Sequence, residues 1–583
     1  MTLGNLRILA VAASVATAAG AFARDLFSAW WLLAPVAVAF WTGGRLERAL
    51  RERTRCQRAV AFYERALARL DGRWAGHGES GARFADEHHL YTRDLDIFGD
   101  ASLFELLCAA RTRTGEETLA DWLRAPAPPA VVRARQAAVE ELVPRLDLRE
   151  DLAVVGEDAR AGVDGKALAS WGERPPATPT LPPRAVALGL SAAGALALAA
   201  VGVYVLAAGD AIRLDAGVQT GLRVYFLAAA IVLAPVSWRF WRTTERILSE
   251  VDEAAHDLAL LAGVLRRLET ERFVAPRLVA LRAQLDVDGR PPSWRIARLR
   301  RLRDLVDSRD HLIVRLTSPL LFWDLHLVYA VEAWRRTSGP ALRRWLDAIG
   351  EIEALSSLAG YASEHPGDRF PEFTDDSPCF AAEQLAHPLI PEDRAVPNDV
   401  RLDAGLRVLV VSGSNMSGKS TWLRTVGVNA VLAQAGAPVR ASRLRLSPLA
   451  VGASIRLQDS LQEGTSRFYV EITRLRRIMA QAGGARPVLF LIDECLHGTN
   501  SHDRRIGAEA VVRGLVDRGA IGLVTTHDLA LAHIAEALAP RGANVHFEDF
   551  LEDGRIRFDY RMRPGVVQKS NALELMRSIG LEV

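Results

Sequence analysis

The sequence predicts an α/β domain with a parallel-rich sheet at the C-terminus, preceded by an all-α region that carries two hydrophobic helical hairpins. From about Phe370, short β-branched runs at 407–412, 488–492 and 521–525 alternate with helical stretches, as parallel sheets with crossover helices require. Upstream, segments rich in arginine and glutamate place apolar residues at helical spacing over 46–70 and 247–285. Two regions, 8–41 and 185–236, are apolar enough to suggest a membrane.

Composition limits the function classes. A chain of 583 residues with 49% hydrophobic residues can bury several cores, so disorder is excluded as its main property. The 72 basic and 70 acidic residues give a net charge of +2, so any binding to nucleic acid must be local. The cysteines are far apart and form no metal-binding pattern, so we expect reduced, unligated thiols and no disulfide: Cys56, Cys108, Cys379 and Cys495.

A phosphate-binding loop opens the α/β domain. Residues 413–420, Gly-Ser-Asn-Met-Ser-Gly-Lys-Ser, fit the pattern G-x-x-x-x-G-K-[ST], follow an apolar run at 408–411 and open a helical stretch. Glycines let backbone N–H groups surround phosphates, Lys419 can bridge phosphate oxygens, and the hydroxyl of Ser420 can bind Mg²⁺. Because the flanking elements agree with the motif, we favour an ATP and Mg²⁺ site over a chance match in a turn.

Two later strands are expected to complete this site. The apolar run 489–492 ends in Asp493 and Glu494, which places one carboxylate beside the magnesium and the other where it can orient a water molecule. The run 522–526 ends in His527, whose imidazole can hydrogen-bond the γ-phosphate or the water. An acidic pair alone is more often a helix cap, and a lone histidine is usually structural. Their order after the phosphate loop favours catalytic roles for Lys419, Glu494 and His527.

The wording of these motifs resembles the ATPase domain of the MutS family of DNA mismatch-repair proteins, an ABC-type P-loop domain. The loop matches the family form Gly-x-Asn-Met-x-Gly-Lys-Ser-Thr, and Pro-Asn-Asp at 397–399, Gly-Thr at 498–499, Thr-His at 526–527 and Pro-Gly at 564–565 match as well. Residues 464–471 are similar to the family's signature loop, whose serine contacts ATP bound in the opposite subunit. The resemblance therefore implies a homodimer in which Ser466 acts in trans. The nucleotide-binding residues it implies are Gly413, Ser414, Asn415, Met416, Ser417, Gly418, Lys419, Ser420 and Thr421, with Ser420 and Asp493 as Mg²⁺ ligands.

The resemblance extends upstream, but with departures. Residues 95–104, 111–115 and 134–140 look like the start of the helical core and lever of MutS proteins, and 349–355 look like its end, so 95–165 and 245–583 are covered. The N-terminal position of the mismatch-reading and connector domains holds a hydrophobic hairpin instead. The lever region is too short for a full DNA clamp, a second hairpin interrupts it, and no nuclease motif is visible at the C-terminus. Ser414 and Ser417 replace a proline and a glycine of the family loop.

Each hydrophobic region reads as a transmembrane hairpin. The first holds runs 8–23 and 26–41, and the second holds 185–208 and 224–236, of which only 185–208 reaches the ~20 residues needed to span a bilayer unaided. Tryptophans at 41, 238 and 241 would lie at the interface. Arginines follow both hairpins, so both are expected to begin and end in the cytoplasm: Arg45, Arg48, Arg51, Arg53, Arg55, Arg239, Arg242 and Arg246.

Two other interpretations of the hydrophobic regions stay open. A signal peptide would explain Arg7, a short apolar core and the Ala-Phe-Ala site at 21–23, but it would export an ATPase away from its ATP. Buried helices of a soluble bundle would explain the short runs and small residues. We favour membrane attachment, which places the chain in the cytoplasmic membrane as a multi-pass protein with its ATPase domain facing the cytoplasm.

The expected organisation has six parts. Hairpin 1 occupies 1–44, a helical segment 45–94, the first part of the helical core 95–180, hairpin 2 181–242, the second part of the core 243–369, and the ATPase domain 370–583.

The expected function is ATP hydrolysis in a dimeric composite site coupled to conformational change, and DNA binding in repair or recombination without mismatch readout stays open. A transporter is an alternative, although Gly-Thr-Ser-Arg-Phe at 464–468 replaces the transporter sequence Leu-Ser-Gly-Gly-Gln. A nucleotide-switched membrane scaffold is another, although Glu494 and His527 are intact.

Overall fold

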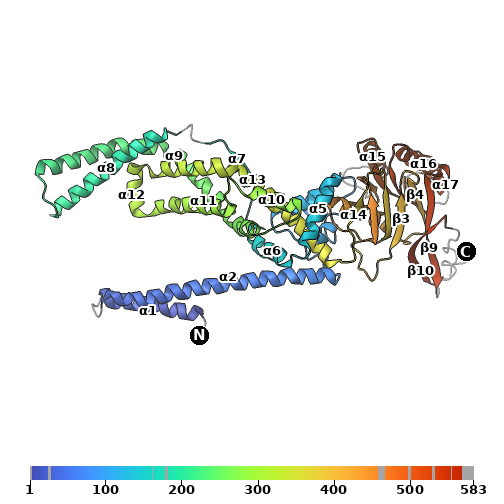
Figure 1. Ribbon diagram of the computed structural model, residues 1–583, viewed down its shortest axis with the longest axis horizontal. Coiled ribbons are helices and arrows are strands. Elements are labelled where there is room, and N and C mark those ends of the chain that lie inside the picture. The colour runs from blue at the N-terminus through green and yellow to red at the C-terminus, as the bar shows by residue number, and fades with distance from the viewer. Residues whose placement is uncertain are drawn as a thin grey trace.

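The computed structural model describes residues 3–23, 28–160, 162–176, 181–209, 211–456, 467–496, 500–527, 532–552 and 555–567. The molecule is elongated (Figure 1), with the α/β domain at one end, a bundle of helices in the middle and the apolar helices at the other end. One large apolar core runs from the helical bundle into the sheet of the α/β domain, which joins the two regions.

The C-terminal domain is built on a six-stranded sheet of order β10-β9-β4-β8-β7-β6. All pairs are parallel except β10 with β9. The runs predicted at 407–412, 488–492 and 521–525 form β4, β7 and β8, which are adjacent in the sheet. The strands are β4 (Val408–Ser412), β6 (Ala450–Ser454), β7 (Val488–Asp493), β8 (Ile521–Thr526), β9 (Gly542–Glu552) and β10 (Arg555–Pro564).

Four helices accompany this sheet, and a smaller sheet precedes it. The helices are α14 (Lys419–Ala435), α15 (Arg467–Gln481), α16 (Ser501–Asp517) and α17 (His533–Ala537). The smaller sheet has the order β1-β5-β2-β3. Its strands are β1 (Glu372–Phe373), β2 (Phe380–Leu385), β3 (Asn398–Leu402) and β5 (Arg443–Leu446), and the sequence analysis predicted none of them.

The helical bundle is organised around α13 (Trp323–Glu364). Its buried Trp334 and Trp345 donate hydrogen bonds to the carbonyls of Arg295 and Leu285, at 2.8 and 2.9 Å, which fixes α13 against two neighbouring segments. The other bundle helices are α3 (Leu103–Leu107), α4 (Arg113–Arg124), α5 (Pro129–Leu142), α6 (Leu146–Arg160), α7 (Gly165–Glu173), α10 (Pro276–Leu285), α11 (Pro292–Asp307) and α12 (Leu312–Leu321).

Two segments that resemble the ends of the MutS core meet in this bundle. The buried carboxylate of Glu353 on α13 accepts hydrogen bonds from the backbone N–H groups of Arg111 and Thr112, at 3.3 and 3.1 Å. Thr112 is the N-cap of α4, so one carboxylate satisfies the backbone at the start of that helix. Burial raises the pKa of Glu353.

The apolar helices are paired. Helix α1 (Leu3–Ala23) packs along α2 (Leu33–Leu70), and α8 (Arg184–Ala208) packs along α9 (Ala216–Glu269), as Figure 1 shows. By length and composition, three helices of the described residues could cross a membrane, Gly4–Phe22, α8 and α9, and a fourth candidate is the bent pair α12 and α13. The predicted run 26–41 is not among these candidates, because its described part continues as the polar helix α2.

The long helices α2 and α9 also cross two of the boundaries drawn from the sequence. The divisions at 44/45 and 242/243 fall inside α2 and α9, so each hairpin continues as a rigid helix into the bundle. A charged cluster holds both helices to α6. Asp151 on α6 accepts a hydrogen bond from Arg55 of α2 at 2.9 Å and one from Arg267 of α9 at 2.8 Å.

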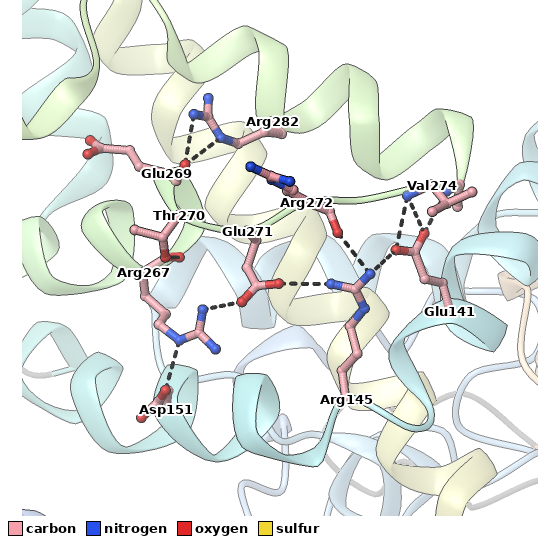
Figure 2. Close-up of polar contacts among 11 residues, drawn as sticks. Glu141, Arg145, Asp151, Arg267, Glu269, Thr270, Glu271, Arg272, Val274 and Arg282 are labelled. Carbon is pink, nitrogen blue, oxygen red and sulfur yellow. Dashed lines mark hydrogen bonds and ion pairs between the residues drawn. The ribbon is translucent and has the colours of Figure 1, made fainter.

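The cluster extends to the connection between α9 and α10, which Figure 2 shows. Glu271 pairs with Arg267 and with Arg145, the latter at 2.8 Å. Glu141 in turn accepts hydrogen bonds from the backbone N–H groups of Val274 and Ala275. Because these groups are partly buried and linked in series, they fix the end of α9 on the turn between α5 and α6.

Candidate nucleotide site

The phosphate loop lies between β4 and α14, as its motif predicts. Gly413 and Gly418 have φ values of 147° and 99°, which side chains rarely tolerate. A Cβ at Gly413 would lie 2.8 Å from Ser417 Oγ and 2.9 Å from the carbonyl of Phe547, so only glycine fits there. The observed shape of the loop therefore requires glycine at both positions.

Lys419 lies against the loop that it follows. Its Nζ donates hydrogen bonds to the carbonyls of Gly413 and Ser414, both at 2.8 Å, and the side chain is buried. Burial lowers the pKa of Lys419, while Glu494 and Asp493 act in the opposite direction. The hydroxyls of Ser414 and Ser417 are buried and have no hydrogen-bond partner in the described part of the chain. This arrangement fits a phosphate, because its oxygens supply acceptors for an ammonium and for hydroxyl donors.

The structure brings the two expected magnesium ligands together. Ser420 Oγ, at the start of α14, donates a hydrogen bond to Asp493 Oδ2, at the end of β7, over 2.5 Å. The other oxygen of Asp493 accepts a hydrogen bond from Thr525 on β8. Mg²⁺ prefers one or two protein oxygens together with phosphate oxygens and water, so Ser420 and Asp493 suit it. In the described residues, no group of three or more His, Cys, Asp or Glu offers a rival metal site.

Glu494 and His527 form a pair at the same edge of the sheet. His527 Nδ1 lies 3.0 Å from Glu494 Oε1, and both side chains are partly exposed. The backbone N–H of Glu494 donates to Thr525 Oγ1 at 3.1 Å, and its φ of 49° turns the chain out of the strand. Thr525 therefore orients both acidic residues, a role that the sequence analysis did not assign to it.

One open cavity of about 960 Å³ lies beside the phosphate loop and Glu494. The loop residues Asn415, Met416, Gly418, Lys419, Ser420 and Thr421 line it together with Glu494. Phe558 and Tyr560 add aromatic surface that can stack on a base, and the buried Phe547 lies behind it. His387 also lines the cavity, and burial lowers its pKa to about 4, so this imidazole is neutral near pH 7.

Asn398, from the Pro-Asn-Asp segment, ties the aromatic wall of the cavity in place. Its side chain donates a hydrogen bond to the carbonyl of Tyr560 at 2.9 Å and accepts one from the backbone N–H of Met562 at 2.7 Å. These contacts fix β10 against the smaller sheet. Asn398 therefore shapes the cavity by binding the backbone of β10. Motif spacing alone does not reveal this role.

Ser466 and the Gly-Thr pair at 498–499 lie outside the described residues. The helix that follows Ser466, α15, is anchored at the site, because Glu471 accepts a hydrogen bond from the backbone N–H of Leu496 at 2.5 Å. Asp94, from the segment before the helical core, accepts hydrogen bonds from the backbone N–H groups of Ile455 and Arg456, at 2.7 and 2.8 Å. Asp94 also pairs with Arg474 of α15. Asp94 thus contacts residues that precede the signature loop in the sequence and a residue that follows it.

Comparison with known proteins agrees with this geometry. Residues 409–582 match the family model MutS domain V. The chain is 34% identical over 265 residues to the DNA mismatch repair protein msh3 of Emericella nidulans, covering 43% of this chain and 23% of that protein. It is 30% identical over 280 residues to the DNA mismatch repair protein MutS of Geobacillus kaustophilus (47% and 31%), and 33% identical over 244 residues to the endonuclease MutS2 of Thermus thermophilus (40% and 30%). In each case the match spans less than a third of the relative's length.

Proposed function

We propose that this chain, whose C-terminal domain is a MutS-type ATPase domain that uses ATP with Mg²⁺, is a membrane-anchored motor. The proposal is carried by the arrangement of the elements. In Figure 1 the α/β domain lies at one end, the paired helices α1–α2 and α8–α9 lie at the other, and continuous helices join them. The α/β domain holds the nucleotide cavity, and the paired helices expose apolar side chains. ATP binding and hydrolysis at one end would then act on the membrane-bound end through α2, α9 and α13.

The described residues divide the work of hydrolysis. Bound Mg²⁺ neutralises phosphate charge, and Ser420 and Asp493 are the groups that would hold it. Lys419 stabilises negative charge on the phosphate oxygens. Glu494 orients a water molecule and accepts its proton, while His527 keeps the Glu494 carboxylate in position through the 3.0 Å contact. Lys419, Ser420 and Glu494 line the cavity. Asp493 contacts Ser420 and His527 contacts Glu494 behind that lining, and Ser466 would act from a second copy.

Ser466 is proposed to act on the nucleotide of a second copy. The MutS, MutS2 and msh3 proteins are relatives of this domain, and the resemblance implies that two copies enclose two nucleotides. Each site would combine the Lys419 side of one copy with the Ser466 side of its partner. Closure on ATP would move α15, and the Asp94 contacts to Arg474 and to the β6 end would pass that movement to the helical region.

Membrane anchoring is supported by exposure. Large apolar side chains point outward along the paired helices, which is unfavourable in water. They include Ile8, Val15 and Phe22 on α1, Phe40 on α2, Leu196 and Val205 on α8, and Ile231 and Val232 on α9. The cluster around Asp151 connects both pairs to one helix of the bundle. The pairs would therefore move with the bundle.

DNA binding without mismatch readout is the second proposal, because three relatives carry names from DNA repair or DNA cleavage. Both proposals are tested by the ATPase rate of the full chain in lipid vesicles, with no DNA, homoduplex, heteroduplex and branched DNA, beside Lys419→Ala. We expect Lys419-dependent turnover without DNA. A rate unaffected by every DNA, with no detectable binding, would remove the DNA proposal and leave the motor proposal intact. No turnover under any condition would contradict the motor.

A further inference from the structure

Helix α12 exposes its apolar side. Leu312, Ile313 and Leu316 are 71%, 77% and 67% exposed, and they lie on one side of the helix at i, i+1 and i+4. A helix at the surface of a soluble bundle presents its polar side to water. In α12 the relation is reversed, so a further partner is expected to cover this side.

The C-terminal end of α12 is fixed to the second apolar pair. A Cβ added at Gly194 of α8 would lie 1.9 Å from the carbonyl oxygen of Leu320, so the two backbones are in direct contact. Ser191 Oγ, one turn earlier on α8, lies 2.8 Å from the carbonyl oxygen of Leu321 and 2.7 Å from His326 Nε2. Leu320 itself is buried. Helix α12 is therefore packed firmly against the α8–α9 pair.

The direction of α12 differs from that of its neighbours. Phe322 adopts a left-handed conformation (φ 51°) that ends α12, and α13 leaves at an angle of 81°. Figure 1 shows α12 as a short helix that runs across the ends of α11 and α13, close to the base of the α8–α9 pair. If α8 and α9 cross a bilayer, this orientation lays α12 along the bilayer surface. Its contacts with residues 191–194, two to three turns into α8, place it at the boundary between headgroups and acyl chains.

Exposed arginines on α12 and on its two neighbouring apolar helices can bind an anionic surface. Four of them have no ion-pair partner in the described part of the chain: Arg184 at the start of α8, Arg239 and Arg242 on α9, and Arg315 on α12. Trp238 and Trp241, also exposed, lie on the same stretch of α9. Arginine next to exposed tryptophan is typical of the membrane interface.

We propose that α12 is a surface-lying membrane helix, which inserts Leu312, Ile313 and Leu316 into the cytoplasmic leaflet while the arginines bind anionic lipid phosphates. The helix lies outside both predicted hairpins, and this inference rests on the proposed membrane anchoring. The helix α12 would be a third point of attachment to the membrane. Because α13 follows α12 directly, movement of α13 would move α12 at the lipid surface.

The test uses the full chain in vesicles of phosphatidylcholine and phosphatidylglycerol, labelled with an environment-sensitive fluorophore at one cysteine. Cys56 is exposed and is replaced by serine, while Cys108, Cys379 and Cys495 are buried. The probe is placed by Ile313→Cys, and the matched control is Val274→Cys, an 83% exposed apolar residue on the connection between α9 and α10. Quenchers are aqueous iodide and nitroxides attached to lipid near the headgroup or deep in the acyl chain.

We expect a blue-shifted emission at position 313, protection from iodide and strongest quenching by the shallow nitroxide, with none of these at position 274. A probe at 313 that behaves like the probe at 274, in protein that remains in the vesicles, overturns the α12 proposal alone. Strongest quenching by the deep nitroxide also overturns it, because it indicates a helix that enters the bilayer. Protein absent from the washed vesicles would instead contradict membrane anchoring itself.

A second variant tests the side chains directly. Leu312→Glu combined with Leu316→Glu changes only exposed positions, so folding should be retained, and the probe at 313 should lose its blue shift and its iodide protection. Retained protection in this variant would contradict the insertion of these residues. Vesicles of phosphatidylcholine alone should show weaker protection of the wild-type helix, and equal protection would contradict the role of the arginines.

Discussion

His527 Nδ1 lies 3.0 Å from Oε1 of Glu494, so the residues that follow β7 and β8 form one pair beside the phosphate loop. A carboxylate in this position can accept a proton from water, whereas an amide cannot. The pair therefore allows a direct test of the assigned chemistry.

Glu494→Gln should lower the turnover number for ATP about 100- to 1000-fold, with ATP binding retained, because only the proton acceptor is lost. The measurements are kcat for phosphate release and the Kd of a fluorescent ATP analogue. The matched control is Glu536→Gln, since Glu536 forms a similar pair with His533 at 2.7 Å on the exposed helix α17. Unchanged turnover in Glu494→Gln would indicate a nucleotide switch instead of an ATPase.

Thr525→Val should raise the Mg²⁺ concentration needed for half-maximal activity about 10-fold, because outer ligands that orient a metal ligand contribute on this scale. The variant removes the hydrogen bond to Asp493 and the acceptor of the Glu494 backbone N–H. Thr337→Val on α13, which removes only a contact within its own helix, serves as the control. The same Mg²⁺ requirement in Thr525→Val and wild type would exclude this role.

Lys419→Ala and Ser466→Ala should each be inactive alone and should recover activity when mixed. If each site combines the two sides from different copies, a mixed dimer contains one intact site. With random exchange, half of the dimers are mixed, so about a quarter of the wild-type rate is expected for a two-fold dimer. The recovered activity is measured as the ATPase rate after subunit exchange in detergent. A mixture as inactive as its components would argue that each copy works alone.

Acid should destabilise the ATPase domain through His387. Burial lowers the pKa of His387 from 6.5 to about 4, so the unfolded chain binds a proton that the folded chain does not. The resulting stability is complete above pH 6.5 and is lost as the pH falls toward 4, to a total of about 3 kcal/mol. The Tm of the full chain in detergent should fall over this range, and His387→Asn should reduce the fall. Equal slopes for both proteins would contradict the assignment.

Local patterns were sufficient to predict the three strands whose ends carry the expected site residues. Strands β4, β7 and β8 are continuous apolar runs that end in recognisable residues, and parallel strands bring those ends together. The contact of Ser420 with Asp493 follows from this rule. The roles of Thr525 and Glu471 do not follow from it. Thr525 contacts a side chain on another strand, and Glu471 contacts the backbone of a distant segment, so neither partner can be predicted from a local pattern.

Long-range pairing explains the features that local sequence patterns did not predict. The smaller sheet pairs β1 and β2 with β5, about 60 to 75 residues away, and β1 has only two residues, so no local signal was available. Helix α12 was missed because its apolar run is shorter than a membrane span and its bend depends on the conformation of Phe322. Helices α2 and α9 continue through the expected domain boundaries. The apolar runs end at these boundaries, but the residues that follow still favour a helix.

We propose that ATP hydrolysis at the Lys419 site belongs to a protein held in a membrane. Its most direct measurement is the ATPase rate of membranes washed with alkaline carbonate, prepared from cells expressing the wild type or Lys419→Ala. We expect the chain and its Lys419-dependent activity both to remain with the washed membranes. Recovery of the chain and all of that activity in the soluble fraction would contradict it.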